Sequence, residues 1–188
     1  MNDDHIDLST LEADPITWIF TGRYRCLDNF YPLPLYIDGL MWPTSEHYYQ
    51  AMKTDNPRYR NKVRNAKSPG EAKALGRDPK HPPTPHWEAG LKFDVMRRAL
   101  KVKFDPEINF PIWAGLMMTG VRPIYEGNTW NDDIWGIIKQ TDGSWSGKNH
   151  LGRMLMWLRD HPGVLYDPAT SYAKFTHVNT IHINRGTL

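Results

Sequence analysis

Apolar residues recur along most of this chain with the spacing of an α-helix. The clearest case spans residues 85–104, where Trp87, Leu91 and Val95 begin one apolar face of a predicted amphipathic helix. Capping residues, and proline in the first turn, mark the starts of the other helices. Those helices are predicted over residues 44–54, 57–66, 69–76, 112–118 and 149–160.

Runs of β-branched and aromatic residues predict a few short strands between the helices. These runs span residues 16–22, 35–40, 121–126 and 172–184, and the second ends at the Asp38-Gly39 turn signal. The pattern predicts a compact α+β fold, mostly helical, that forms a single domain over residues 16–188. Residues 1–15 are expected to precede it as an acidic tail or a helix.

The composition of the 188 residues fits one globular domain. Hydrophobic residues make up 40% of the chain and eight residues are tryptophan, so an intrinsically disordered chain is excluded. The longest apolar runs are shorter than the roughly 20 residues of a membrane helix, and we see no secretory signal. Cys26 is the only cysteine, which excludes an internal disulfide and suits a reducing compartment. We therefore expect a cytoplasmic protein with no membrane partner.

Charge is distributed unevenly along the chain, although the formal net charge is only +2. Residues 1–14 contain five acidic residues and no Lys or Arg, whereas residues 58–80 contain eight basic residues against two acidic ones. Such a basic stripe can attract phosphates of a nucleic acid or of a small nucleotide. It is equally typical of a solvated helix surface.

Common cofactor and metal motifs are absent from the sequence. It contains no G-x-x-x-x-G-K-[ST], no G-x-G-x-x-G after a strand and no H-E-x-x-H. The eight histidines do not form a cluster with the spacing of known metal ligands. We therefore predict neither a metal nor an organic cofactor.

One predicted helix presents three polar groups at helical spacing. Glu46, Gln50 and Lys53 occupy positions i, i+4 and i+7, so a carboxylate, an amide and an amine lie on one face. Glu46 and Lys53 are separated by ~10.5 Å along the axis, which allows both side chains to reach one ligand. The alternative is an ordinary solvated helix face.

A second group of candidate residues lies in the segment 131–136. Asp132 and Asp133 stand next to Trp135 and Gly136, which suits a turn with an exposed carboxylate and an aromatic platform. The same pattern suits an Asx turn beside a core tryptophan. Both interpretations stay open on the sequence alone.

A third candidate is the helix start at Gly147-Lys148-Asn149. Its free backbone N–H groups and the Lys148 ammonium could receive a phosphate. The alternative is an ordinary cap, in which Asn149 bonds the first turn and glycine allows close packing. The residues thus indicate a pocket for an anionic ligand.

Seven segments, read in order, resemble the NADAR (NAD- and ADP-ribose-associated) family of YbiA-like N-glycosidases. They are Asp28-Asn29-Phe30-Tyr31-Pro32, the run from Trp42 to Lys53, Leu75-Gly76-Arg77, Trp87 with Met96 and Lys103-Phe104, Thr119-Gly120 with Glu126, Asp132-x-x-Trp135-Gly136, and the run from Gly147 to Arg159. The resemblance covers about residues 17–160. One departure is Asp28, where the family commonly has serine.

The resemblance implies a helix-rich α+β fold and cleavage of N-glycosidic bonds to ribose 5-phosphate or ADP-ribose. Known activities of the family are hydrolysis of early riboflavin-pathway ribosylaminopyrimidine phosphates and removal of ADP-ribose from guanine in nucleic acid. The expected partner is therefore a small phosphorylated ribosyl or ADP-ribosyl substrate, free or carried on nucleic acid. The oligomeric state is not predicted.

Roles follow from what C1′–N cleavage requires. Glu46 and Asp132 are assigned to the carboxylate near C1′ and the acid near the base, in either order. Lys53 is expected to donate a proton or to form a Schiff base. The residues expected to bind substrate are Asn29, Gln50, Arg77, Trp87, Glu126, Trp135, Lys148 and Asn149.

Two other functions stay open at this point. The same pocket could bind ADP-ribose or NAD without cleaving it. Alternatively, residues 58–80 could form a helical nucleic-acid-binding module, whose affinity would depend steeply on salt and not on Glu46.

Overall fold

The computed structural model describes residues 16–17, 20, 22–162 and 179–183. The expected acidic tail, residues 1–15, lies outside the described residues, as does most of the strand expected over 172–184. The described part has an α+β fold in which helices predominate and the strands are short.

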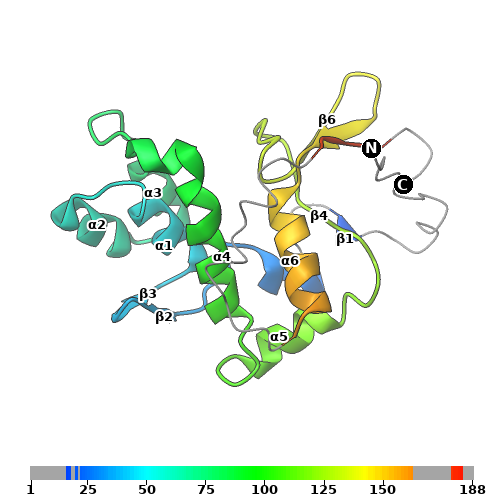
Figure 1. Ribbon diagram of the computed structural model, residues 1–188, viewed down its shortest axis with the longest axis horizontal. Helices are drawn as coiled ribbons and strands as arrows, with labels where there is room; N and C mark the ends of the chain where they lie inside the picture. The colour runs from blue at the N-terminus through cyan, green and yellow to red at the C-terminus, as the bar shows by residue number, and fades with distance from the viewer. Residues whose placement is uncertain (1–15, 18–19, 21, 163–178, 184–188) are drawn as a thin grey trace.

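Four helices form one side of the molecule (Figure 1). They are α1 (Ser45–Ala51), α2 (Pro57–Arg64), α3 (Pro69–Leu75) and α4 (Lys92–Lys103). Every residue of α1 is buried, because this helix contacts each of the other three. Thr44 caps α1 by accepting a hydrogen bond from the His47 N–H, as its sequence predicts. Helix α1, which carries Glu46 and Gln50, is thus packed on several sides.

The other side combines two helices with most of the strands (Figure 1). The helices are α5 (Phe110–Met117) and α6 (His150–Asp160), and α6 contacts both α4 and α5. The sheet has the order β5 (Gly127–Asn128), β6 (Ile137–Lys139), β7 (Trp145–Gly147) and β8 (Ile181–Ile183). β1 (Ile16–Thr17) pairs in parallel with β4 (Ile124–Tyr125), and α6 contacts β4.

The strand predicted over 35–40 is one arm of a hairpin. β2 (Leu35–Ile37) turns at Asp38 and Gly39, both at positive φ, and pairs antiparallel with β3 (Leu40–Trp42). The strands predicted over 16–22 and 121–126 are wrong in extent: only two residues of each form a described strand. A 3-10 helix, η2 (Gly22–Leu27), follows the first of them.

The helix predicted over 85–104 is interrupted rather than continuous. A π-helical stretch, η3 (Trp87–Leu91), precedes α4, and Gly90 within it has a φ of 125°. That angle lies outside the right-handed helical region, so the chain kinks there. The apolar face nonetheless reaches the core, since Trp87 and Val95 are both buried.

Candidate active site

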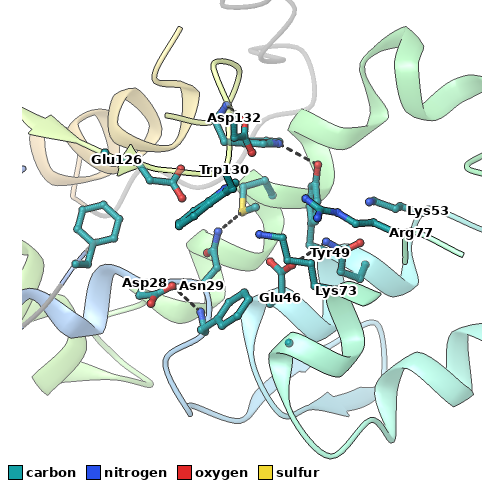
Figure 2. Close-up of a pocket in the computed structure, with 17 residues that line it drawn as sticks. Asp28, Asn29, Glu46, Tyr49, Lys53, Lys73, Arg77, Glu126, Trp130 and Asp132 are labelled. Carbon is teal, nitrogen blue, oxygen red and sulfur yellow. Dashed lines mark hydrogen bonds between the residues drawn. The ribbon is translucent and has the colours of Figure 1, made fainter. Parts of the chain in front are cut away.

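A cavity of about 580 Å³ opens between the two sides of the molecule (Figure 2). Its walls come from the segment after η2, from α1, from α3 and the turn that follows it, from α4, and from the segment between β4 and β6. Eight of the eleven predicted site residues line this cavity: Asn29, Glu46, Gln50, Lys53, Arg77, Glu126, Asp132 and Trp135.

Glu46 is a buried carboxyl group on the cavity side of α1. Gln50 Nε2 donates a 2.7 Å hydrogen bond to Glu46 Oε1, as the i, i+4 spacing allows. Burial raises the pKa of Glu46 above its usual value, while Gln50, Lys73 and Lys53 oppose that rise. The Glu46 N–H donates to the carbonyl of Asn29, so the loop after η2 is tied to the start of α1.

Lys53 lies just beyond α1 and brings its amine to the same cavity. Its Nζ donates to the carbonyl of Gly76 at 3.2 Å and lies 5.7 Å from the ring centroid of Tyr49. Burial lowers the pKa of Lys53, and the nearby Glu46 carboxylate opposes that effect. A lowered pKa increases the fraction of neutral, nucleophilic amine.

Asp132 closes the turn of the segment 131–136. Its Oδ1 accepts from the N–H groups of Ile134 and Trp135, at 3.2 and 2.9 Å, which is the predicted Asx turn. Asp132 also lines the cavity. Trp135 Nε1 donates to the Tyr49 hydroxyl at 3.1 Å, and this bond links the segment to α1.

Glu126 is a second carboxyl group of the cavity with a raised pKa. Its Oε2 is buried and has no hydrogen-bond partner among the residues that the structure describes. Burial, followed by repulsion from Asp132, Asp28 and Glu46, raises the pKa of Glu126 to about 8. The side chain therefore carries a proton at neutral pH and can donate a hydrogen bond to a ligand.

The basic residues of the segment 58–80 lie partly at the cavity and partly on the outer surface. Lys73 on α3 and Arg77 just after it line the cavity. Arg58, Lys62, Lys67 and Lys80 are exposed and do not line it. Two cations therefore face the carboxylates of the cavity, where they can receive a phosphate.

Three predicted site residues do not line the cavity. Trp87 is only 2% exposed and packs against Tyr49 at a centroid distance of 4.8 Å. It lies behind Lys53, whose Nζ is 5.9 Å from its ring. Trp87 thus shields the amine from water instead of facing the ligand space.

Lys148 and Asn149 are the other two, and backbone N–H groups at the helix start that they form are already hydrogen-bonded. The N–H groups of residues 148–151 donate to the carbonyls of Asp133, Gly136, Ile134 and Trp135. Asn149 is fully buried with a φ of 51° and makes no cap bond with its side chain. Its Oδ1 instead accepts from the Glu126 N–H, and its Nδ2 donates to the Ile124 carbonyl. The phosphate site expected here is therefore corrected: these donors join α6 to the Asp132 turn.

Sequence reasoning missed several residues that line the cavity: Phe20, Asp28, Phe30, Tyr49, Lys73, Met96 and Trp130. Two of them carried a usable signal, because Tyr49 stands one turn from Glu46 and Lys73 one turn before Arg77. Trp130 directly precedes the candidate segment, but nothing in its spacing distinguishes it from a core residue. Met96 accepts from Asn29 Nδ2 at 3.5 Å, a contact between distant segments.

Two further properties concern the described residues as a group. Among them, no three His, Cys, Asp or Glu side chains gather where they could hold a metal ion. No helix within the same residues is long and apolar enough to cross a membrane.

Comparison with known proteins gives a consistent set of relatives. N-glycosidase YbiA of Escherichia coli (strain K12) is 40% identical over 137 residues, which are 73% of this chain and 81% of that protein. A riboflavin biosynthesis protein of Vibrio vulnificus is 36% identical over 71% of this chain, which corresponds to 34% of its own length. N-glycosidase Npun_R5314 of Nostoc punctiforme is 34% identical, over 73% of this chain and 85% of that protein.

A solved structure and a family model agree with these relatives. The NMR structure of E. coli YbiA superimposes with a TM-score of 0.63 and 35% identity, covering 89% of this chain and 92% of that one. The NADAR domain model matches residues 18–161, which include every residue that lines the cavity. This chain therefore belongs to the NADAR family.

Proposed function

We propose that this protein is a hydrolase that cleaves the C1′–N bond of a ribose-phosphate or ADP-ribose N-glycoside. The observation that carries the proposal is that Glu46, Lys53 and Asp132, from two distant segments, line one cavity. Relatives named N-glycosidases and riboflavin biosynthesis proteins support the same class of reaction. The two substrate groups considered are ribosylaminopyrimidine phosphates and ADP-ribosylated guanine.

The size and charge of the cavity suit such a substrate. Its volume of about 580 Å³ is within the usual range for a small-molecule site. Lys73 and Arg77 supply positive charge for a phosphate, and Asn29 supplies an amide for a ribose hydroxyl or a base edge.

C1′–N cleavage builds positive charge on the ribose and requires a proton on the departing nitrogen. In the proposed mechanism the Asp132 carboxylate stabilises the positive charge at C1′. The hydrogen bonds that its Oδ1 accepts from the N–H groups of Ile134 and Trp135 keep this carboxylate in position. Glu46, whose pKa is raised by burial, delivers the proton to the departing nitrogen. Gln50 keeps Glu46 in place for this role. Water then adds to C1′ and loses a proton, which completes the hydrolysis.

Lys53 offers a covalent route for glycosides whose nitrogen carries a hydrogen. The C1′–O4′ bond breaks, O4′ takes a proton, and the nitrogen loses its hydrogen, which leaves an imine at C1′. Lys53 Nζ adds to C1′, and the base nitrogen is protonated and leaves with the electron pair of the C1′–N bond. Water then hydrolyses the lysine imine to the ribose aldehyde and free Lys53.

Release of the base is the measurement that tests the proposal. Ribosylaminopyrimidine phosphates and ADP-ribosylated guanosine are incubated with the wild type, Glu46→Gln and Lys53→Met, and with Lys62→Met as a matched lysine control on α2. We expect base release from at least one substrate, a loss of about 10²-fold or more in Glu46→Gln, and normal activity in the control. Borohydride should trap a ribose adduct that Lys53→Met lacks.

Each opposing result has a defined meaning. Tight binding of ADP-ribose without release of any base would replace the hydrolase with a binding module. Unchanged activity in Lys53→Met would eliminate the covalent route while leaving hydrolysis through the carboxylates.

A further inference from the structure

The cavity contains a large aromatic side chain that is accessible to solvent. Trp130 is 45% exposed, and it is the only tryptophan among the described residues whose side chain counts as exposed. Figure 2 shows it between Glu126 and Lys73, with its indole at the cavity. A second aromatic residue, Phe30, lines the same cavity from the segment after η2.

The Lys73 ammonium lies close to both rings. Its Nζ is 5.6 Å from the Phe30 centroid and 4.9 Å from the Trp130 centroid. The two ring centroids are therefore at most about 10.5 Å apart, and a planar ring stacked between two others needs about 7–8 Å. A planar ligand can reach the space beside both rings once the flexible lysine side chain has moved aside.

Hydrogen bonds to neighbouring residues hold both aromatic residues at the cavity. The Phe30 N–H donates to Asp28 Oδ1 at 2.9 Å. The loop of Trp130 is closed by Asn128, whose Nδ2 donates to the Asp132 carbonyl and whose Oδ1 accepts from the Asp132 N–H. The two rings thus belong to held loops that flank one opening.

The two tryptophans predicted to stack on the substrate, Trp87 and Trp135, already make other contacts. Trp87 is buried behind Lys53, and the Trp135 indole N–H is bonded to the Tyr49 hydroxyl. Trp130 and Phe30 are the aromatic side chains of the cavity that lie near the Lys73 ammonium.

We propose that Phe30 and Trp130 form the base-binding subsite, stacking on either side of the planar nitrogenous base of an N-riboside phosphate. This inference rests on the proposed function for the identity of its ligand. In the free protein the Lys73 ammonium lies beside both rings, and we expect binding to move it toward the phosphate. Because every base has a π-face, stacking supplies affinity for any planar base, and selection among bases depends on the polar groups Asn29 and Glu126.

Binding measurements separate this subsite from catalysis. The probes are ribose 5-phosphate, guanosine 5′-phosphate and cytidine 5′-phosphate, with affinity measured by calorimetry. We expect the wild type to bind both nucleotides more tightly than ribose 5-phosphate. Trp130→Ala should weaken nucleotide binding by about 10-fold or more and leave ribose 5-phosphate binding unchanged. Phe30→Leu should act in the same direction, and Trp130→Phe should restore most of the nucleotide affinity.

The matched control is Trp113→Ala, since Trp113 lies in a separate groove beside Leu116 and Leu158. It should leave the binding of all three probes unchanged. The subsite is overturned if the wild type binds ribose 5-phosphate as tightly as the nucleotides, or if Trp130→Ala weakens all three equally. Failure of the proposed function is a different result, namely that no N-riboside releases its base whatever the nucleotide affinities are.

Discussion

The ammonium group of Lys103, buried on α4, donates a 2.6 Å hydrogen bond to the backbone carbonyl of Asp28. Asp28 begins the segment that brings Asn29 and Phe30 to the cavity. Lys103 does not line the cavity, so it contributes to the site by holding this segment in place.

Lys103→Met should change how stability depends on pH. Burial lowers the pKa of Lys103 from 10.5 to about 7, whereas in the unfolded chain it keeps its usual value. Between these values the unfolded state binds more protons, so this lysine makes the free energy of unfolding rise with pH. In the difference between the wild type and Lys103→Met, that rise should approach about 1.4 kcal/mol per pH unit. Urea denaturation across this pH range measures it, and a pH-independent difference would show that Lys103 is charged in the folded protein.

Gly76→Ala should reduce activity through Gln50. A Cβ at position 76 would lie 2.9 Å from both Cβ and Cδ of Gln50, and closer still to its Oε1. Gln50 must then shift, and Glu46 loses the hydrogen bond that orients it. We expect a fall of about 10²-fold in kcat, the size of effect that an ångström-scale misplacement produces.

A double-mutant cycle identifies the route of this effect. In a Gln50→Gly background the Cβ, Cδ and Oε1 atoms that the added methyl group meets are all absent, so Gly76→Ala should cause little further loss. An equal loss in both backgrounds would mean that position 76 acts another way, through its carbonyl bond to Lys53.

Glu126→Gln should remove the alkaline limb of the pH profile. Burial raises the pKa of Glu126 to about 8, so the wild type loses this hydrogen-bond donor as the pH rises through that value. The amide of glutamine donates at every pH, and kcat/KM should then stay level where the wild type declines. Lys103→Met should retain this alkaline decline, because Lys103 does not line the cavity although its pKa, about 7, is close to that of Glu126. A limb that persists in Glu126→Gln would assign the decline to another group.

The part of the site that could be predicted from the sequence lies on one helix. Thr44 as a cap and the i, i+4 spacing of Glu46 and Gln50 define a local geometry on α1 that tertiary contacts did not change. The helix predicted over residues 44–54 is too long, because α1 ends at Ala51, and Lys53 reaches the cavity from the turn that follows. Helical periodicity also located α4, although the kink at Gly90 depends on a backbone angle that periodicity does not encode.

The rest of the site depends on contacts between distant segments. Trp87 and Trp130 have similar side chains, yet one is buried behind Lys53 and the other faces the cavity, because their tertiary neighbours differ. β4 and β5 have two residues each, which is too short for an alternating pattern. Asn149 has the sequence position of a cap, but its left-handed backbone directs the side chain to β4.

Asn149→Asp tests whether this asparagine has a structural role or binds a ligand. The aspartate keeps an acceptor for the Glu126 N–H but turns a second oxygen toward the Ile124 carbonyl, where Asn149 Nδ2 now donates at 2.8 Å. An unpaired buried carbonyl beside a buried carboxylate should lower the free energy of unfolding by about 2–3 kcal/mol in urea denaturation. Asn149→Gly, which tolerates the φ of 51° but loses both bonds, should also destabilise the fold. A normal free energy of unfolding combined with lost ribose 5-phosphate affinity would instead make Asn149 a ligand-binding residue.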